Sequence, residues 1–446
     1  MHSITMAGLT AEVDALQLTA DIGRVRAVEG NLLRISGLTR SARVGDQVYL
    51  TSSAGDRIKG EVIQLQNDEL SVLPEVPPNG VGLGDRAGLI RVSGVSPSTA
   101  WIGRIVDPDG HPLDGHPLLR GEEVRSRRAA PPPAAQRRAM GARLETGLNV
   151  FNTMLPLVRG QRMGLFAGSG VGKSTLLGQL ARGVSADVVV LAMIGERGRE
   201  LRDFVENVLG PEGMARSVVV AATSDQSPIL RRRCAWTAMA VAEYFRDQGK
   251  QVLLLADSIT RFAEAHREVA VASGEMPALR GYPPSTSHMI MSLCERAGTG
   301  SADQGDITAV FSVLVAGSDM EEPIADILRG VLDGHAVLDR RIAERGRFPA
   351  VDLLRSVSRS LPGAASAMQN QAIGTVRRLL SEYEDAEMMI KAGLYKEGTD
   401  ANIDTAIRAQ PELEAIWGDA GIKSVSDSFA RLDLALRRAG ALAQHP

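Results

Sequence analysis

Residues 164–178 read GLFAGSGVGKSTLLG, and this stretch decides the fold. An apolar run typical of a strand enters a glycine-rich loop, and a helical pattern follows the loop. Glycines allow positive φ angles and let successive backbone N–H groups turn towards a phosphate. The start of the helix adds unpaired N–H groups and the positive end of the helix dipole. The stretch therefore predicts a nucleoside triphosphate site between a strand and a helix.

Individual positions of this loop have expected tasks. Lys173 is expected to reach the β- and γ-phosphates, and the hydroxyl of Ser174 is expected to hold Mg²⁺. The loop pattern calls for glycine first, where this chain has Ala167, and alanine is tolerated there if its φ is negative. The residues expected to wrap the phosphates of ATP are Ala167, Gly168, Ser169, Gly170, Val171, Gly172, Lys173, Ser174 and Thr175.

The composition is that of an ordinary globular chain. Its 446 residues are enough for two or three domains, and the formal net charge of −3 argues against general coating of nucleic acid. Two cysteines suit a reducing compartment. The N-terminal residues lack the pattern of a signal peptide, and no apolar run reaches membrane-spanning length. We therefore expect a cytoplasmic protein.

The patterns of apolar residues and turn residues divide the chain into four segments. In residues 1–20 a short helical pattern competes with a frayed terminus. Residues 21–92 carry short β-like runs separated by turns, which predicts a small closed β-barrel used for assembly. Residues 93–362 alternate apolar strands with helical patterns, which predicts an α/β fold with a mostly parallel sheet covered on both faces. Residues 363–446 show helical spacing of apolar residues and are expected to form a separate helical domain.

Ligands of parallel α/β sheets bind at the carboxyl ends of the strands, so the strand ends indicate where to look for chemistry. The expected strands of the central segment are residues 163–166, 188–193, 218–222, 252–256 and 307–315, and helices are expected to begin near Lys173, Glu200, Arg232 and Arg261.

Two acidic residues end predicted strands at that edge. Asp257 closes VLLLAD, where a carboxylate that orients Mg²⁺ is expected, and the alternative is an N-cap of the following helix. Glu196 ends VVVLAMIGE and is the candidate to polarise the attacking water, whereas the alternative is a salt bridge with Arg197 or Arg199. The arginines at 231–233 are expected to form a solvated or interface run without a catalytic role.

Motifs beyond the loop resemble one superfamily. GLFAGSGVGKST is followed by GERGRE (195–200), VAEYFRDQGKQVLLLADSITRFA (241–263), GYPPS (281–285) and PAVDLLRSVS (349–358). In this order they resemble the catalytic subunits of the rotary ATPases and type III export ATPases. The resemblance spans roughly residues 20–430. It implies a RecA-like P-loop core between an N-terminal β-barrel and a C-terminal helical domain, assembled as a six-membered ring.

The resemblance also implies roles at matching positions. Glu196 matches the general base, and Arg197 matches the residue beside the γ-phosphate. Asp257 closes the Walker B strand. Phe348 matches the aromatic residue that packs on adenine, and Arg359 matches the arginine finger offered to the site of the neighbouring subunit. Non-catalytic subunits of rotary enzymes typically lack a carboxylate at the position of Glu196, so the chain resembles an active copy.

Two stretches resemble the export ATPases more than the synthase subunits. These are FAGSGVGKS and the segment GLYKEGTDANIDTAIRAQPELEAIW (393–417), and residues 195–228 are nearer to the flagellar form. Asn152 stands where the superfamily usually has Asp, and we expect a local change in hydrogen bonding there. The resemblance therefore implies a homohexameric ATPase that uses ATP and Mg²⁺ and supports the unloading and export of flagellar proteins.

The partners implied by this resemblance are a regulator, a stalk protein, export chaperones with their cargo and the export gate. They imply a position at the cytoplasmic face of the inner membrane. Three alternatives stay open: an injectisome secretion ATPase, a Rho-like RNA translocase and a non-catalytic ring subunit. The aromatic-poor barrel argues against base stacking and so against RNA. The joint presence of Glu196 and Arg359 argues against a non-catalytic subunit.

Overall fold

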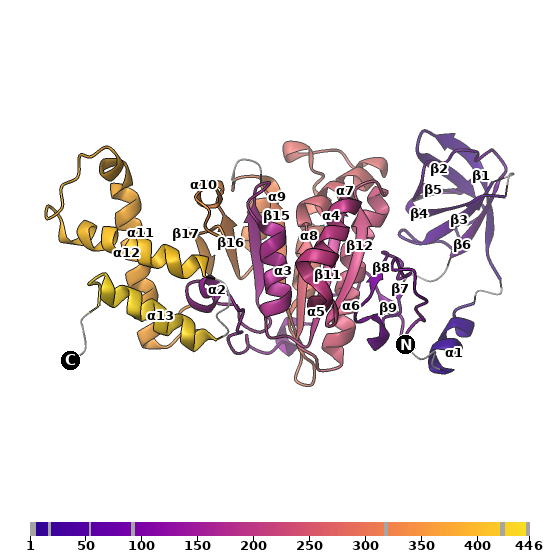
Figure 1. Cartoon of the computed structure of the whole chain (residues 1–446). Coiled ribbons are helices and arrows are strands. Elements are labelled where there is room, and N and C mark those ends of the chain that lie inside the picture. Colours follow the sequence, from indigo (N-terminus) through magenta and orange to yellow (C-terminus); the bar gives the residue numbers. More distant parts are fainter. Residues whose placement is uncertain are drawn as a thin grey trace.

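A computed structural model describes residues 6–16, 19–52, 55–90, 94–315, 320–419 and 424–442. Three parts lie in a row, with a β-barrel at one end, a layered α/β part in the middle and a group of helices at the other end (Figure 1). A short helix, α1 (Met6–Asp14), precedes the barrel. The helical pattern predicted near the N-terminus is thus present over these residues, while the predictions for residues 1–5, 17–18 and 91–92 lie outside the described residues.

The barrel closes from antiparallel strands in the order β1-β2-β5-β4-β3-β6. Its strands alternate buried apolar and exposed polar side chains, so one apolar set fills the interior. The predicted closed barrel is confirmed, although its sixth strand did not stand out among the β-like runs of the sequence. The strands are β1 (Ile22–Glu29), β2 (Leu32–Ser36), β3 (Gln47–Thr51), β4 (Arg57–Gln66), β5 (Glu69–Pro74) and β6 (Arg86–Ile90).

The central sheet has the order β17-β16-β10-β15-β13-β11-β12-β8, and β14 pairs with β15 at the side. Its strands from β16 to β8 run parallel, and β17 is antiparallel on the edge. Every strand predicted for this segment is present, and β8, β14, β16 and β17 are additional. The strands are β8 (Ile105–Val106), β10 (Arg162–Ala167), β11 (Val188–Glu196), β12 (Ser217–Thr223), β13 (Val252–Asp257), β14 (Gly298–Thr299), β15 (Asp306–Leu314), β16 (Gly334–Leu338) and β17 (Val351–Ser358).

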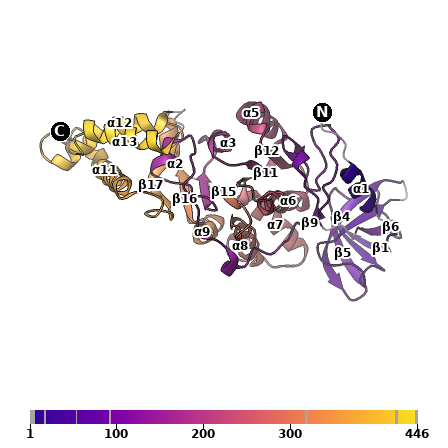
Figure 2. The same ribbon diagram turned by 90° about the horizontal axis from the view of Figure 1, so that it is seen from below.

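Helices cover both faces of this sheet, as the near-continuous apolar strands predict (Figure 2). Along β11, alternate side chains enter two separate cores, because neighbouring residues of a strand point to opposite faces. One core continues into α3, and the other into α6 to α9. The helices are α2 (Asn149–Thr153), α3 (Lys173–Gly183), α4 (Gly198–Asp203), α5 (Gly210–Met214), α6 (Pro228–Asp247), α7 (Ile259–Ala272), α8 (Ser285–Arg296), α9 (Pro323–Val331) and α10 (Arg340–Glu344).

The C-terminal part consists of α11 (Ala367–Lys391), α12 (Ala401–Gly418) and α13 (Val425–Arg438). Asn152 fastens this part to α2. Its side-chain oxygen accepts from the backbone N–H and the hydroxyl of Thr146, at 3.0 and 2.9 Å, and its Nδ2 donates to Ser428 Oγ at 3.1 Å. An aspartate has no such donor. The hydrogen-bond change expected at this position therefore serves to dock α13.

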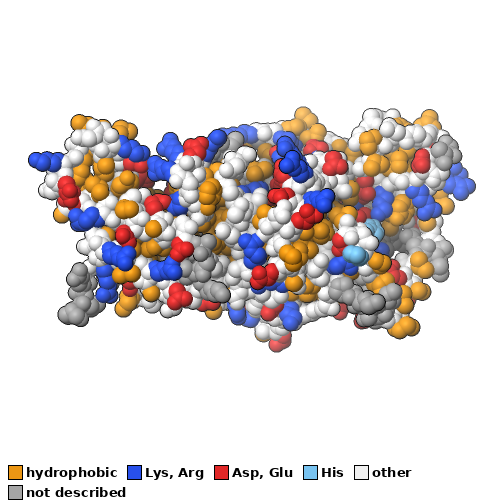
Figure 3. Space-filling view, in the orientation of Figure 1, with side chains coloured by type: hydrophobic (Ala, Val, Ile, Leu, Met, Phe, Trp, Pro, Cys, Tyr) orange, Lys and Arg blue, Asp and Glu red, His pale blue; other side chains and the backbone are white. Residues whose placement is uncertain are grey.

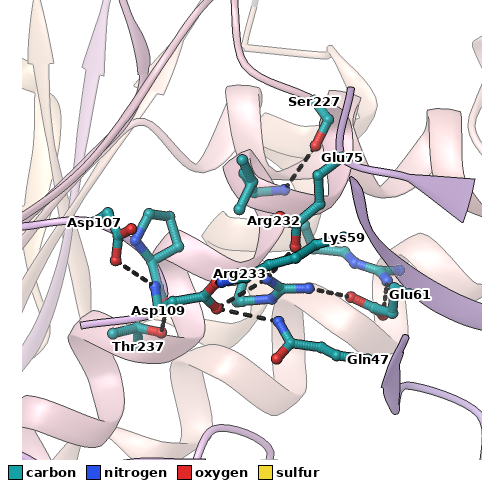
Figure 4. A network of polar contacts seen from close by, with 12 residues as sticks. Gln47, Lys59, Glu61, Glu75, Asp107, Asp109, Ser227, Arg232, Arg233 and Thr237 are labelled. Atoms are coloured by element: carbon teal, nitrogen blue, oxygen red, sulfur yellow. Dashed lines mark hydrogen bonds and ion pairs between the residues drawn. The ribbon is translucent and has the colours of Figure 1, made fainter. Parts of the chain in front are cut away.

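The arginines at 231–233 are not a solvated run. Arg232 and Arg233 are only 5% and 3% exposed, because α6 presents them to the barrel. Arg232 Nη2 lies 2.7 Å from Glu61 Oε1, and Arg233 Nη1 lies 2.6 Å from Glu75 Oε1 and 2.9 Å from Asp109 Oδ1 (Figure 4). The interface alternative is therefore correct in an intramolecular sense: these cations join the barrel to the central part.

The surface carries mixed charge. On the face shown in Figure 3, Lys and Arg side chains are interspersed with Asp and Glu over all three parts. Among the described residues, no helix combines the length and apolar character needed to cross a bilayer.

Candidate functional site

The glycine-rich loop lies where the sequence predicts it, between β10 and α3. β10 ends at Ala167, which pairs with Leu314 of β15 and Leu338 of β16. Gly170 and Gly172 have φ of 76° and 85°, which explains the glycines at these two positions. Ala167 does not have a positive φ, since Arg280 is the single described non-glycine residue that does. The condition for an alanine at the start of the loop is therefore met.

A cavity of about 970 Å³ opens over the carboxyl ends of β10 and β11. Most of the predicted phosphate-binding residues line it, together with the end of β11. Val171 is instead buried beneath the loop. The predicted residues that line the cavity are Ala167, Gly168, Ser169, Gly170, Gly172, Lys173, Ser174, Thr175, Glu196 and Arg197, and residues not singled out from sequence include Ser224, Thr260, Glu264, Arg280, Tyr282 and Glu322.

Asp257 ends β13 behind this cavity and is almost fully buried. Lys173 Nζ contacts its carboxylate, and Ser312 Oγ donates to Asp257 Oδ1 at 2.6 Å. The N-cap of α7 is the next residue, Ser258, whose side chain accepts from Arg261 N at 3.3 Å. The capping alternative for Asp257 is therefore wrong, and its carboxylate contacts the lysine of the loop.

Glu196 lies on the other side of the same lysine. Its Oε1 is 3.7 Å from Lys173 Nζ. Burial raises the pKa of Glu196 to about 7, the negative charge of Asp257 adds to this rise, and Lys173 opposes it. Arg197 is exposed and pairs with Glu200 at 3.7 Å. A carboxylate whose pKa lies near neutral pH beside this cavity is suited to accept a proton from water.

The residues present fit a small hard cation such as Mg²⁺, which prefers oxygen ligands. Ser174 places its hydroxyl in the first turn of α3, open to the cavity. Asp257 supplies a buried carboxylate that is held in place by Ser312. An alcohol and a carboxylate next to a phosphate loop are the donor set that the predicted roles require.

Phe348 lies beside the loop. A side chain added at Gly172 would place its Cβ 3.0 Å from the ring of Phe348, so the glycine permits this close approach. The ring is exposed. It is thus free to contact a base next to the phosphate site.

Arg359 is the one predicted site residue that the fold places far from the cavity of its own chain. The carboxyl end of β16, Leu338, pairs with Ala167 at the start of the loop. The amino end of β16, Gly334, pairs with Ser358, the residue before Arg359. Four residues of strand, about 13 Å at about 3.3 Å per residue, therefore separate Arg359 from the loop edge. Its exposed guanidinium donates to Arg329 O at 3.2 Å.

Sequence reasoning missed Ser312, which contacts Asp257 directly. The signal that could have found it is a serine in the otherwise apolar second half of the strand DITAVFSVL, close to the strand end. Such a residue in a buried strand needs a polar partner.

Comparisons with known proteins agree with this geometry. Residues 147–358 match the ATP synthase alpha/beta family, nucleotide-binding domain, and residues 365–417 match the T3SS EscN ATPase C-terminal domain. A flagellum-specific ATP synthase from Caulobacter vibrioides is 43% identical over 437 residues, covering 96% of this chain and 98% of the relative.

Two solved structures of a secretion ATPase share the fold. The assembled ATPase EscN from the type III secretion system of enteropathogenic E. coli matches with a TM-score of 0.86 at 35% identity, covering 93% of this chain and 100% of that chain. The same ATPase in complex with its central stalk EscO matches with a TM-score of 0.84 at 35% identity and the same coverage. The chain is therefore an ATP-hydrolysing enzyme and belongs to the family of the flagellum-specific ATP synthases.

Proposed function

We propose that this chain forms a ring and hydrolyses ATP at sites shared between neighbouring subunits. The observation that carries the proposal is the position of Arg359. The loop, Lys173, Glu196 and Asp257 come together at the carboxyl ends of the parallel strands. Arg359 lies exposed at the opposite side, next to the amino end of β16. This position supports a role for Arg359 at the site of another subunit rather than at the site of its own chain.

The proposed chemistry begins with binding of the triphosphate. Loop N–H groups and Lys173 bind the phosphates, so Lys173 exchanges its contact with Asp257 for the nucleotide. Ser174 and Asp257 would hold Mg²⁺, which neutralises charge on the phosphate oxygens. Phe348 packs on the adenine.

Hydrolysis then requires a water positioned at the γ-phosphate. Glu196 accepts its proton, for which a pKa of about 7 is suitable. Arg197 and the Arg359 of the neighbouring subunit stabilise the charge on the transferred phosphoryl group.

We further propose that the ring is a homohexamer of the flagellar export apparatus. The flagellum-specific relative and the EscN–EscO complex support a flagellar role and a stalk protein within the ring. A regulator, export chaperones with cargo and the export gate complete the proposed set of partners, at the cytoplasmic face of the inner membrane. The match of residues 365–417 to a secretion ATPase domain supports an injectisome ATPase as the second candidate.

A complementation experiment tests the shared site. Glu196→Gln and Arg359→Ala should each bind ATP and turn over at least about 100-fold more slowly than wild type. After the two inactive variants are mixed and allowed to exchange subunits, about one quarter of random interfaces combine an intact Glu196 with an intact Arg359, so activity should return.

Arg355→Ala is the matched control, because Arg355 is also an exposed arginine and lies on the adjoining strand. It should keep wild-type activity. Absence of any recovery in the mixture, or full activity of Arg359→Ala alone, would show that the site is not shared in this way.

A further inference from the structure

Ser312 is a fully buried hydroxyl in the middle of the central sheet. β15, which carries it, lies between β10, which leads into the phosphate loop, and β13, which ends in Asp257. Leu165 of β10 is its register partner, and the preceding residue, Phe311, pairs with Ala256 of β13. Ser312 is therefore level with the end of β13, where the two strands bring it to Asp257.

The contacts at this point divide into two groups. The backbone after Asp257 is fixed independently of Ser312: Ser258 caps α7, and Thr260 Oγ1 accepts from Leu314 N at 2.9 Å. The carboxylate of Asp257 is held separately, by Ser312 Oγ at 2.6 Å and by Lys173 Nζ, both on Oδ1. Ser312 thus acts on the orientation of the carboxylate rather than on the course of the chain.

ATP binding would affect the two partners of the carboxylate, Lys173 and Ser312, differently. Lys173 extends from the first turn of α3 into the cavity, so it can turn to the nucleotide phosphates. Ser312 is enclosed within the sheet and has no such alternative. A buried carboxylate that loses one donor depends on those that remain, since an unsatisfied charged group is unfavourable in a dry interior.

We propose that Ser312 is a positioning residue of the ATPase site. Its hydroxyl keeps the Asp257 carboxylate in its orientation towards the cation site when Lys173 moves to the phosphates. This inference rests on the proposed function, because it assumes that Asp257 and Ser174 hold Mg²⁺ together with ATP.

The test measures equilibrium binding of a fluorescent, non-hydrolysable ATP analogue to the full chain, with and without Mg²⁺. Without Mg²⁺, Ser312→Ala should bind the analogue as wild type does. The gain in affinity on adding Mg²⁺ should be about tenfold smaller in Ser312→Ala, equivalent to about 1.4 kcal/mol. Ser312→Thr, which keeps the hydroxyl, should retain the gain. In an Asp257→Asn background, Ser312→Ala should cause no further loss.

Ser217→Ala is the matched control. Ser217 is equally buried in β12 of the same sheet and donates at the same distance, 2.6 Å, but to the backbone oxygen of Gly213. It should keep the full Mg²⁺ gain. An equal loss in both alanine variants would overturn the proposal, because the effect would then be a general loosening of the sheet. A full Mg²⁺ gain in Ser312→Ala would overturn it as well.

Two further outcomes separate other failures. If wild type does not bind the analogue either with or without Mg²⁺, the proposed function itself is contradicted. The outcomes above contradict only the role of Ser312. If Ser312→Ala does not fold, as judged by circular dichroism, Ser312→Cys takes its place, since a thiol fills similar space but donates weakly. A Mg²⁺ gain in that variant equal to wild type would refute the proposal, and a reduced gain would support it.

Discussion

Replacing Glu61 by glutamine should loosen the barrel from the central part of the molecule. The Glu61 side chain is 4% exposed and faces three guanidinium groups, those of Arg128, Arg232 and Arg233, at 3.0, 2.7 and 3.2 Å. Burial pushes the pKa of Glu61 up, but the arginines outweigh burial and hold the pKa below its ordinary value. The carboxylate is therefore ionised and serves as the shared anion of the junction.

The size of the effect follows from what each arginine keeps. Glutamine preserves volume and one acceptor oxygen but removes the negative charge. Arg233 still pairs with Glu75 and Asp109, whereas Arg232 is left with a distant contact to His266 Nδ1 at 3.5 Å. Arg232 also keeps the ring of Trp236, whose centroid lies 5.0 Å from its guanidinium carbon. Breaking a buried ion pair by removing one partner costs about 3–5 kcal/mol, and the partial compensation places this variant near about 3 kcal/mol.

Urea unfolding of the full chain measures the loss, and amide hydrogen exchange locates it. Exchange should quicken in peptides from β4 and α6, while α11 to α13 stay unchanged. Glu29→Gln is the matched control, since Glu29 lies on the same barrel and pairs with Arg34 at 2.9 Å on the exposed surface. A midpoint for Glu61→Gln that shifts no more than the control would refute the reasoning, because the junction would then not depend on the buried charge.

The remaining predictions concern pH and the C-terminal part. Turnover should rise as pH increases through about 7 and level off above it, because burial raises the pKa of Glu196, and Glu196 must be deprotonated to act as the proposed general base; a pH–rate profile checks this. The pKa of Glu61 and of Asp109 is depressed, so their stabilisation is present above the ordinary carboxyl pKa of about 4 and is lost as pH falls further; the protection of β4 amides, measured relative to the intrinsic exchange rate at each pH, should therefore fall below about pH 4. Asn152→Asp should destabilise the chain by about 1–2 kcal/mol, because the buried donor to Ser428 Oγ is lost; the urea midpoint measures this.

Much of the fold could be predicted because its signals are local. The loop at 164–178 combines glycines, a lysine and a hydroxyl in a fixed spacing, and the strands that flank it are apolar on both faces. The edge strand β17 and its neighbour β16 were harder to find. GHAVL is short, and β17 alternates buried with exposed positions only in part, so neither has the uninterrupted apolar pattern of the inner strands. The boundaries at residues 20, 92 and 362 stay a prediction.

The junction and the position of Ser312 could not be predicted, because they depend on contacts between distant parts of the chain. A run of arginines usually indicates a solvated surface. Here Arg232 pairs with a residue 171 positions away, and Arg233 pairs with residues 158 and 124 positions away. The sequence near the arginines does not indicate these partners. The role of Asp257 could be predicted from its position at the end of its own strand, β13. The donor that contacts its carboxylate, Ser312, comes from β15, two strands later in the chain.

The contact between Lys173 and Asp257 has a consequence for the end of the catalytic cycle. Lys173 has a carboxylate partner in its own chain, so a phosphate that binds this lysine has to compete with Asp257. The Asp257 carboxylate competes for the lysine in the same way after hydrolysis has separated the γ-phosphate from ADP. If Lys173 binds the phosphates as proposed, its return to Asp257 would weaken the hold on the products, so the pair that lowers affinity for the substrate would also speed product release.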